Sequence, residues 1–252
     1  MAGKTYFVSG ATRGIGFQIT KQFVLANPEN VVVATARDPT GATALKELAA
    51  SNKNLHIIQL DVTSDTSIES IDSQLSKITS SVDVFISNGA IADALGKVID
   101  IPKKVWEDHY YTNTLGPVLV FQKLYKYLVK GTAKQAIFIS TSASSITQFF
   151  PISVSAYGQS KAALNYTVKE LSFEHGQEGF TVVAVHPGAV STDMGNQAVK
   201  KMSEDDPELV KSLESLIITP EESGLKLKAL FDGFQPKDNG LFYSYDGSEL
   251  AF

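Results

Sequence analysis

A tyrosine and a lysine four residues apart, Tyr157 and Lys161, have the clearest chemical use in this sequence. They lie in a stretch with helical periodicity, where residues four apart share one face. A phenol with a pKa of ~10 ionises reluctantly at neutral pH, and a neighbouring ammonium lowers that pKa by stabilising the phenolate. The spacing is common by chance, so it is compatible with a general acid tuned by a lysine and equally with an aromatic core residue beside a surface lysine, and the context of the pair must decide.

A glycine-rich turn follows the first strand-like run of the chain. It starts at Ser9 and contains Gly10, Gly14 and Gly16, and helical periodicity follows at once. Glycine permits positive φ and close backbone approach, and the first turn of a helix offers unpaired N–H groups to a pyrophosphate. The spacing differs from the GxGxxG fingerprint, so the turn alone is also compatible with a plain strand-to-helix connection.

Seven short runs rich in Val, Ile and Phe alternate with longer helical stretches from end to end. We predict strands at 6–9, 31–35, 56–60, 82–87, 136–140, 181–186 and 241–245. We predict helices at 15–25, 68–78, 105–128, 156–175 and 221–231. Continuous rather than alternating apolarity indicates strands covered on both faces. The order predicts a single α/β domain over residues 1–252, a doubly wound parallel seven-stranded sheet with helices on both faces.

Residues 191–218 break this alternation. The stretch is polar and charged, follows a Pro-Gly pair and is longer than an ordinary connection. We expect either a mobile lid over a substrate site or a helical insertion on the surface, and the sequence leaves both open.

Five segments occur in the order typical of the short-chain dehydrogenases/reductases. The glycine turn resembles the family's TGxxxGxG motif, and the Tyr157–Lys161 pair resembles its YxxxK motif. The resemblance extends over residues 4–194, and within the family the chain is most similar to carbonyl reductases. It implies a Rossmann fold, a bound nicotinamide cofactor and a small-molecule carbonyl substrate.

The choice of cofactor follows from two arginines, the only ones in the chain. Arg13 lies in the glycine turn and Arg37 ends the second strand, both where the resemblance puts the adenosine ribose. A guanidinium holds a phosphate with two hydrogen bonds, so this pair favours the 2′-phosphate of NADP(H). Ala36 occupies the place where an NAD site of the family has a carboxylate. The alternative is that both arginines are solvated surface charges.

The resemblance also assigns further contacts with the cofactor. Asp61 would accept from the adenine amino group, or else form an Asx turn or helix cap. The family's Asn-Asn-Ala-Gly appears here as Ser-Asn-Gly-Ala at 87–90, so we expect the close backbone approach beside the ribose to shift by one residue. Residues 187–194 resemble the segment that holds the nicotinamide carboxamide. The expected cofactor-binding residues are Gly10, Thr12, Arg13, Gly14, Ile15, Gly16, Arg37, Asp61, Val62, Asn88, Gly89, Tyr157, Lys161, Pro187, Gly188, Val190, Thr192 and Met194.

A hydroxyl at the end of the fifth strand should polarise the carbonyl oxygen as it gains charge. Alignment on the strand end selects Thr141, with Ser142 next, whereas the family's usual spacing back from Tyr157 selects Ser144. We place Thr141 first and Ser142 second, because the loop before Tyr157 varies in length.

Asn113 falls inside the predicted helix 105–128 and resembles the family's helix asparagine. An amide there can open the helix ladder for a water that links Lys161 to solvent. Its alternative is a tolerated polar position in the helix.

The composition excludes several classes of protein. With 43% hydrophobic and 19% charged residues the chain is globular, and a net charge of −5 offers no basic field to nucleic acid or an anionic membrane. There is no cysteine, and the four histidines lack metal-ligand spacing, so we expect no metal. No signal-peptide core and no ~20-residue apolar span occur, which predicts a cytoplasmic protein without membrane contact.

These observations predict NADPH-dependent reduction of a ketone or aldehyde to an alcohol, with Tyr157 as proton donor. The alternative is an NADP(H)-binding regulatory protein without turnover, for which the altered segment 87–90 and a threonine in place of the usual serine argue. The substrate and the oligomeric state stay open, because the family contains dimers and tetramers as well as monomers.

Overall fold

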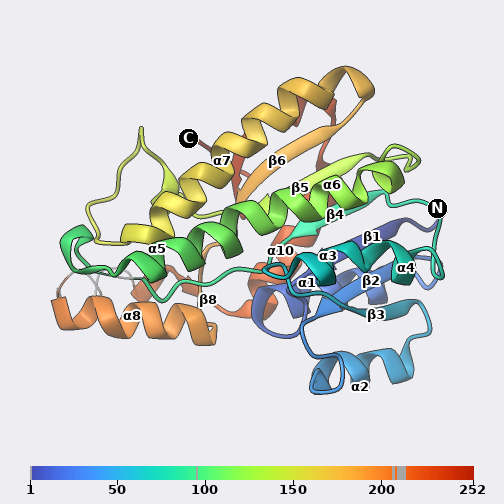
Figure 1. The fold of residues 1–252 in the computed structure, drawn as a ribbon, viewed down its shortest axis with the longest axis horizontal. Helices are drawn as coiled ribbons and strands as arrows, with labels where there is room; N and C mark the ends of the chain where they lie inside the picture. Colours follow the sequence, from blue (N-terminus) through green and yellow to red (C-terminus); the bar gives the residue numbers. More distant parts are fainter. Residues whose placement is uncertain (1, 95, 206–207, 209–213) are drawn as a thin grey trace.

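The chain folds around one central sheet, shown in the computed structural model of Figure 1. The structure describes residues 2–94, 96–205, 208 and 214–252. Within these residues the sheet has eight strands: β1 (Thr5–Ser9), β2 (Val31–Ala36), β3 (Leu55–Gln59), β4 (Val84–Ser87), β5 (Gln135–Ile139), β6 (Thr181–His186), β9 (Phe242–Ser244) and β10 (Glu249–Leu250). Their order is β10-β9-β6-β5-β4-β1-β2-β3, and every pair is parallel except β9 with β10.

The seven parallel strands confirm the predicted ones, each to within two residues at either end. The predicted count of seven is wrong by one, because β10 adds an antiparallel edge strand. This strand has two residues, too few for a recognisable periodicity. It is set by a turn in which Gly247 (φ 86°) donates its N–H to the Ser244 carbonyl at 2.9 Å.

Helices follow most of the strands. They are α1 (Gly14–Ala26), α2 (Thr43–Ser51), α3 (Asp65–Glu69), α4 (Ile71–Leu75), α5 (Lys103–Tyr110), a π-helical turn η2 (Tyr111–Leu115), α6 (Gly116–Leu128), α7 (Ser155–His175), α8 (Asp193–Asp205) and α10 (Pro220–Gly233). Short 3₁₀ turns are η1 (Val98–Asp100), η3 (Ser142–Ser144), η4 (Gly176–Glu178), η5 (Glu214–Leu216) and η6 (Pro236–Asp238). None of the helices in the described part of the chain is long and apolar enough to cross a bilayer.

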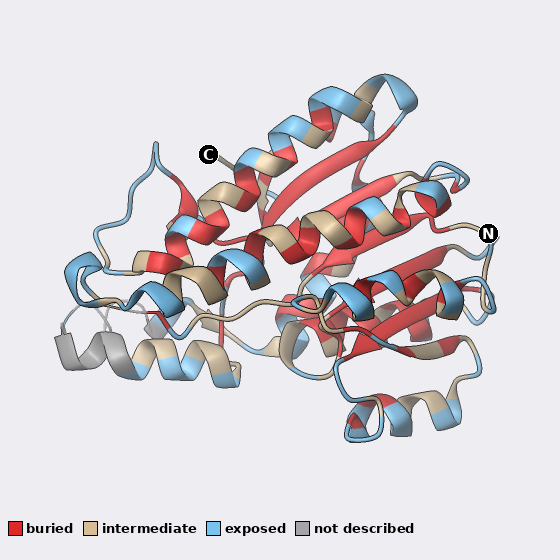
Figure 2. Cartoon of the chain, viewed as in Figure 1, coloured by how far each residue is buried: buried red, intermediate tan, exposed pale blue. Residues whose placement is uncertain are grey.

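Two hydrophobic layers cover the sheet, one on each face. Side chains of α3, α4, α6 and α7 form the first layer, and those of α1, α2 and α10 form the second. Because successive side chains of a strand point to opposite faces, Phe7 joins the first layer while Tyr6 and Val8 join the second. Figure 2 shows the strands buried between the helices.

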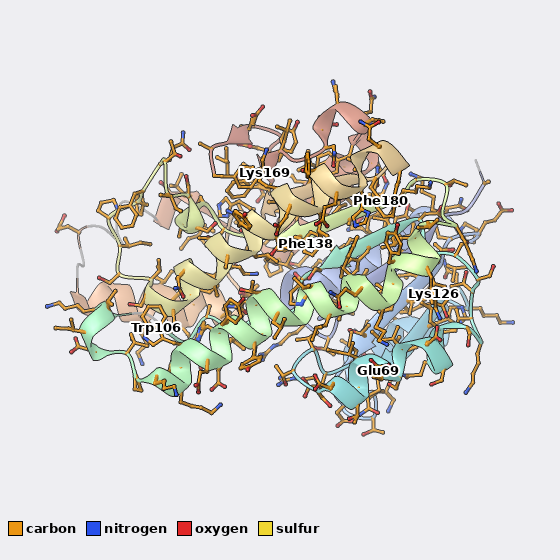
Figure 3. All side chains as sticks on the ribbon, turned by 45° about the horizontal axis from the view of Figure 1, so that its top comes forward. Glu69, Trp106, Lys126, Phe138, Lys169 and Phe180 are labelled. Carbon is orange, nitrogen blue, oxygen red and sulfur yellow. The ribbon has the colours of Figure 1, made fainter. Side chains whose placement is uncertain are left out.

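Aromatic side chains fill the first layer. Phe138 of β5 and Phe180, both labelled in Figure 3, pack on Phe121 of α6 with ring centroids 6.4 and 6.2 Å away. This packing holds α6 against the sheet, and His175 at the end of α7 joins it with its ring centroid 5.9 Å from that of Phe121. Helix α7 is the one that carries Tyr157 and Lys161.

The helices depart from the prediction in three places. The single helix expected at 68–78 is two helices that meet at Ser70, whose side chain donates to the Ser67 carbonyl at 2.7 Å. The helix expected at 105–128 is interrupted by η2. Helix α2 was not predicted, and it packs on the sheet through Leu45, which is fully buried, and through the partly buried Leu48 and Ala49.

The stretch 191–218 contains α8, η5 and a two-residue strand β8 (Ile217–Ile218) that pairs with β7 (Ala189–Val190). The stretch therefore contains a helix where the structure describes it, and its first residues line the cavity described below. Residues 206–207 and 209–213 lie outside the described residues, and a lid motion stays a prediction.

Candidate active site

A cavity of about 520 Å³ opens at the carboxyl ends of the parallel strands. Its wall includes residues that follow or end several strands: Gly10 for β1, Arg37 for β2, Asp61 for β3, Asn88 for β4 and Pro187 for β6. The strand order reverses between β1 and β4, and open α/β sheets bind ligands in the crevice at such a point. The volume lies within the ~300–1,000 Å³ typical of ligand pockets.

The turn between β1 and α1 brings backbone close to this crevice. Gly10 and Gly14 have φ of 66° and 55°, a region that side chains rarely tolerate. A Cβ on Gly10 would lie 2.5 Å from the Gly89 Cα, and one on Gly16 would lie 2.2 Å from the Gly10 carbonyl oxygen. Arg13, the N-cap of α1, makes no side-chain cap hydrogen bond, so its side chain leaves the first-turn N–H groups uncovered. These features fit a bound pyrophosphate.

Asn88 ties the glycine turn to the end of β4. Its Nδ2 donates to the Gly10 carbonyl at 2.9 Å, and its backbone N–H donates to the Ser9 hydroxyl at 3.1 Å. The Gly10 N–H donates in turn to the Thr35 hydroxyl of β2 at 3.3 Å. Asn88 is therefore both part of the cavity wall and a brace for the turn.

Both arginines reach the cavity wall with exposed side chains. Arg13 Nη1 lies 3.2 Å from Asp193 Oδ2, and both side chains are nearly three-quarters exposed. Asp38, the first acidic residue after β2, accepts hydrogen bonds from the Thr40 hydroxyl and N–H, which lower the pKa of Asp38. Asp38 is not part of the described cavity wall.

Asp61 forms the Asx turn that was one of its two predicted interpretations. Its Oδ1 accepts from the Thr63 N–H at 2.9 Å and from the Thr63 hydroxyl at 2.7 Å, which is an Asx turn. Asp61 also lines the cavity, and its contact with adenine stays a prediction.

Tyr157 faces the cavity from the first turns of α7. Burial raises the pKa of Tyr157 to about 12, although a hydrogen bond from the Thr141 hydroxyl opposes the rise. The expectation that an ammonium one turn away lowers this pKa is wrong for this geometry, because desolvation of the phenolate outweighs the opposing hydrogen bond.

Lys161 lies in the same wall and is 3% exposed. Its Nζ donates to the Ile139 carbonyl at the end of β5, at 2.7 Å. Burial lowers the pKa of Lys161 to about 7, so the ammonium is only partly populated at neutral pH. The geometry thus pairs a protonated phenol with a lysine that titrates near neutrality.

Thr141 is the candidate hydroxyl that acts on the pKa of Tyr157, which it lowers. Ser144, the alternative from loop counting, is buried in the protein: its Oγ donates to the Thr141 carbonyl at 2.6 Å and accepts from Asn165 Nδ2 at 2.8 Å. Ser142 is exposed on η3. Among the three hydroxyls, the geometry favours Thr141 as the partner of Tyr157.

Asn113 lies in η2 and is fully buried. Its Oδ1 accepts from the Ile91 N–H, and its Nδ2 donates to the Ile91 carbonyl, both at 2.9 Å. The same Nδ2 donates to Ser160 Oγ on α7 at 3.0 Å. Asn113 therefore joins the segment after β4 to the helix of Tyr157. The π-helical turn agrees with an opened helix ladder, and the water relay stays a prediction.

Comparison with known proteins places the chain in a family. Residues 4–203 match the sequence profile of the short chain dehydrogenases. The chain belongs to the short-chain dehydrogenase family. An uncharacterized oxidoreductase of Schizosaccharomyces pombe is 44% identical over 250 residues, covering 99% of this chain and 98% of the relative. One of Saccharomyces cerevisiae is 47% identical over 253 residues, covering 98% and 97%. The protein is an oxidoreductase.

Solved structures agree with the family. The NADPH-bound carbonyl reductase from chicken fatty liver superposes with a TM-score of 0.88 at 29% identity, covering 100% of this chain and 95% of that one. The carbonyl reductase Sniffer of D. melanogaster superposes with a TM-score of 0.87 and full coverage of both chains. Its 24% identity supports the Rossmann-like fold of the family alone.

Most of the predicted cofactor residues of this family line the cavity. They are Gly10, Thr12, Arg13, Gly14, Ile15, Arg37, Asp61, Val62, Asn88, Gly89, Tyr157, Lys161, Pro187, Thr192 and Met194. Other predicted site residues lie outside its described wall: Gly16, Asn113, Thr141, Ser142, Gly188 and Val190. Gly16 and Gly188 have a structural role instead, since a Cβ on Gly188 (φ 92°) would lie 2.9 Å from Ile218.

Further wall residues were not among the predicted catalytic or cofactor-binding residues. They are Thr35, Ala36, Leu60, Thr63, Ala90, Ile91, Thr112, Ile139, Ser140, Ser191, Asp193 and Pro220. Most are chain neighbours of predicted residues at strand ends, and the rule that ligands bind at the carboxyl ends of strands could have found them. Thr112 and Pro220 come from helical segments and carry no such signal.

The segment that leads from β6 to α8 closes one side of the cavity. Thr192 directly precedes α8, and its Oγ1 accepts from the Gly195 N–H in the first turn at 3.1 Å. Its hydroxyl proton stays available for a ligand, so the predicted carboxamide contact is compatible with this cap. The described residues contain no group of three His, Cys, Asp or Glu placed to hold a metal ion.

Proposed function

We propose that the protein catalyses the NADPH-dependent reduction of a ketone or aldehyde to an alcohol. The observation that carries this proposal is the placement of Tyr157 and Lys161 together in the wall of the cavity at the carboxyl ends of the parallel strands. A phenol whose pKa is about 12 keeps its proton throughout the neutral range. Reduction requires such a donor, because the carbonyl oxygen gains negative charge and must be protonated. The bound dinucleotide supplies the hydride.

Each side chain then has one task. Tyr157 Oη donates its proton to the carbonyl oxygen, and the Thr141 hydroxyl stabilises the charge that develops there. Lys161 returns a proton to Tyr157, and its pKa of about 7 suits it to gain and lose one near neutrality. Asn113 keeps the segment after β4 and α7 in register, so that Ile91 and Tyr157 stay in one wall.

The choice of NADP(H) rests on the chain's own charges. Arg13 and Arg37 lie in the cavity wall, and the carboxylate after β2, Asp38, is committed to Thr40. A planar guanidinium suits a phosphate, whereas a carboxylate would be needed for the 2′-hydroxyl of NAD(H). The similarity to the NADPH-bound carbonyl reductase from chicken fatty liver supports the same choice.

The test is NADPH consumption by the purified protein over a panel of ketones and aldehydes. Tyr157→Phe should lower kcat by about 10²–10⁴-fold, while NADPH binding, followed by fluorescence, persists. Tyr166→Phe is the matched control, since Tyr166 lies on the same helix and is 68% exposed. Full turnover by Tyr157→Phe would reject the assignment. Tight NADPH binding without turnover on any carbonyl compound would favour the regulatory alternative.

A further inference from the structure

The start of α8 lies directly on the glycine turn. A Cβ on Gly14 would lie 3.1 Å from Thr192 Cγ2. The next residue, Asp193, accepts a hydrogen bond from Arg13 Nη1 at 3.2 Å, across 180 residues of sequence. Both partners of this ion pair belong to the cavity wall. The pair therefore joins the part of the cavity expected to hold the dinucleotide to the helix that opens the 191–218 stretch.

Arg13 is the same side chain that the proposed function assigns to the 2′-phosphate. A guanidinium has five N–H donors, and a dianionic phosphate binds them better than a single carboxylate. An anion bonded to this guanidinium would lie within several ångströms of the Asp193 carboxylate, and like charges that close repel each other.

The other charged residues of the described wall do not occupy the position of Asp193 beside Arg13. The charged residues of the described wall are Arg13, Arg37, Asp61, Lys161 and Asp193. Asp61 is engaged in its Asx turn with Thr63, and Lys161 is buried against Ile139. Asp193 is thus the acidic side chain in contact with Arg13.

We infer that Asp193 is a specificity-determining residue that competes with the 2′-phosphate of the dinucleotide for Arg13. This inference rests on the proposed preference for NADP(H). Asp193 then weakens the binding of NADPH but not of NADH, because only NADPH carries the 2′-phosphate. A phosphate bound to Arg13 also breaks the ion pair that joins the glycine turn to α8. The same ion pair therefore affects both the choice of cofactor and the attachment of the 191–218 segment.

The experiment measures the dissociation constants of NADPH and NADH by fluorescence titration, which needs no turnover. Asp193→Asn should tighten NADPH binding by about 2- to 5-fold at low salt, the range of an exposed ion pair, and leave NADH unchanged. The gain should vanish near ~1 M salt, where the Debye length falls to ~3 Å. It should also be absent when Arg13→Ala is already present, because Asp193 then has no guanidinium to compete for.

Two variants serve as controls. Asp193→Glu keeps the charge and should bind NADPH as the unaltered protein does. Asp232→Asn removes one negative charge from a partly exposed ion pair with Lys228 on α10, outside the cavity wall. It should leave both affinities unchanged.

The outcomes separate this inference from the proposed function. Unchanged or weaker NADPH binding by Asp193→Asn, or equal tightening of NADPH and NADH, would overturn the role of Asp193 alone. Equal affinity of the unaltered protein for NADPH and NADH would overturn the inference together with the proposed cofactor. Selective tightening that depends on Arg13 would establish the competition, whether or not a carbonyl substrate has been found.

Discussion

Replacement of Lys161 by methionine tests whether burial lowers the pKa of this lysine. Lys161 is 3% exposed, and burial lowers its pKa from 10.5 to about 7. Because the folded pKa lies below the unfolded one, the unfolded chain binds more protons between these values. Stability must therefore rise with pH across that window. Methionine fills a similar volume and carries no proton.

The magnitude follows from the two pKa values. Each unit of difference is worth about 1.4 kcal/mol, so the buried lysine destabilises the fold by at most about 5 kcal/mol. At pH 7 half of the folded molecules keep the proton, which leaves about 4 kcal/mol, and at pH 9 about 2 kcal/mol remains. Methionine loses the hydrogen bond to the Ile139 carbonyl, at ~1–3 kcal/mol. Lys161→Met should thus be more stable at pH 7, and its advantage should shrink by about 2 kcal/mol at pH 9.

Urea unfolding of both proteins between about pH 7 and 9 measures this difference. Tyr157, with a pKa of about 12, does not titrate in this range. Lys169→Met is the matched control, because Lys169 lies on the same helix, is exposed and also donates to a backbone carbonyl, that of Gly240 at 3.0 Å (Figure 3). Its difference from the unaltered protein should not depend on pH. A difference for Lys161→Met that is constant from pH 7 to 9 would refute the argument from burial.

Two further predictions concern the phenol and the glycine turn. Thr141→Val should lower kcat by about 10²–10³-fold, because Tyr157 and the carbonyl oxygen lose a hydroxyl donor, and Thr141→Ser should restore most of it in the same NADPH assay. Gly10→Ala should lower the Tm and abolish the stabilisation by NADPH, since its Cβ would lie 2.5 Å from Gly89. Gly89→Ala, whose Cβ would lie at an ordinary 3.6 Å from Gly10, should change the Tm little, and an equal loss from both would contradict the steric argument.

The sequence predicted the sheet well because buried parallel strands are continuous apolar runs. The run 181–186 is β6 with the same bounds, and the other parallel strands differ by one or two residues. The two elements that were not predicted are short and are not continuous apolar runs. Strand β10 has two residues and is fixed by a turn, and the one fully buried residue of α2 is Leu45. The break at η2 depends on how Asn113 bonds to Ile91, a contact between distant segments.

The site was predicted in part for the same reason. Residues that end strands, such as Arg37, Asn88 and Pro187, lie together because parallel strands share one carboxyl edge. Spacing alone could not decide between Thr141 and Ser144, because the choice depends on which hydroxyl already has hydrogen-bond partners inside the protein. Asn165 on α7 donates a hydrogen bond to the Ser144 hydroxyl, whereas the Thr141 hydroxyl acts on the pKa of Tyr157. Asp193 was missed because its partner Arg13 is far away in sequence.

The pKa shift of Tyr157 in the structure is opposite in direction to the shift that the motif predicts. The YxxxK spacing indicates a phenol made more acidic by its lysine, yet spacing does not report burial. In the structure both groups are desolvated, so each resists its charged form: the phenol keeps its proton, and the lysine gives its proton up more readily. A pair in this state is ready to protonate an oxygen. The reverse reaction, oxidation of an alcohol, needs the phenolate and should therefore require a higher pH than reduction does.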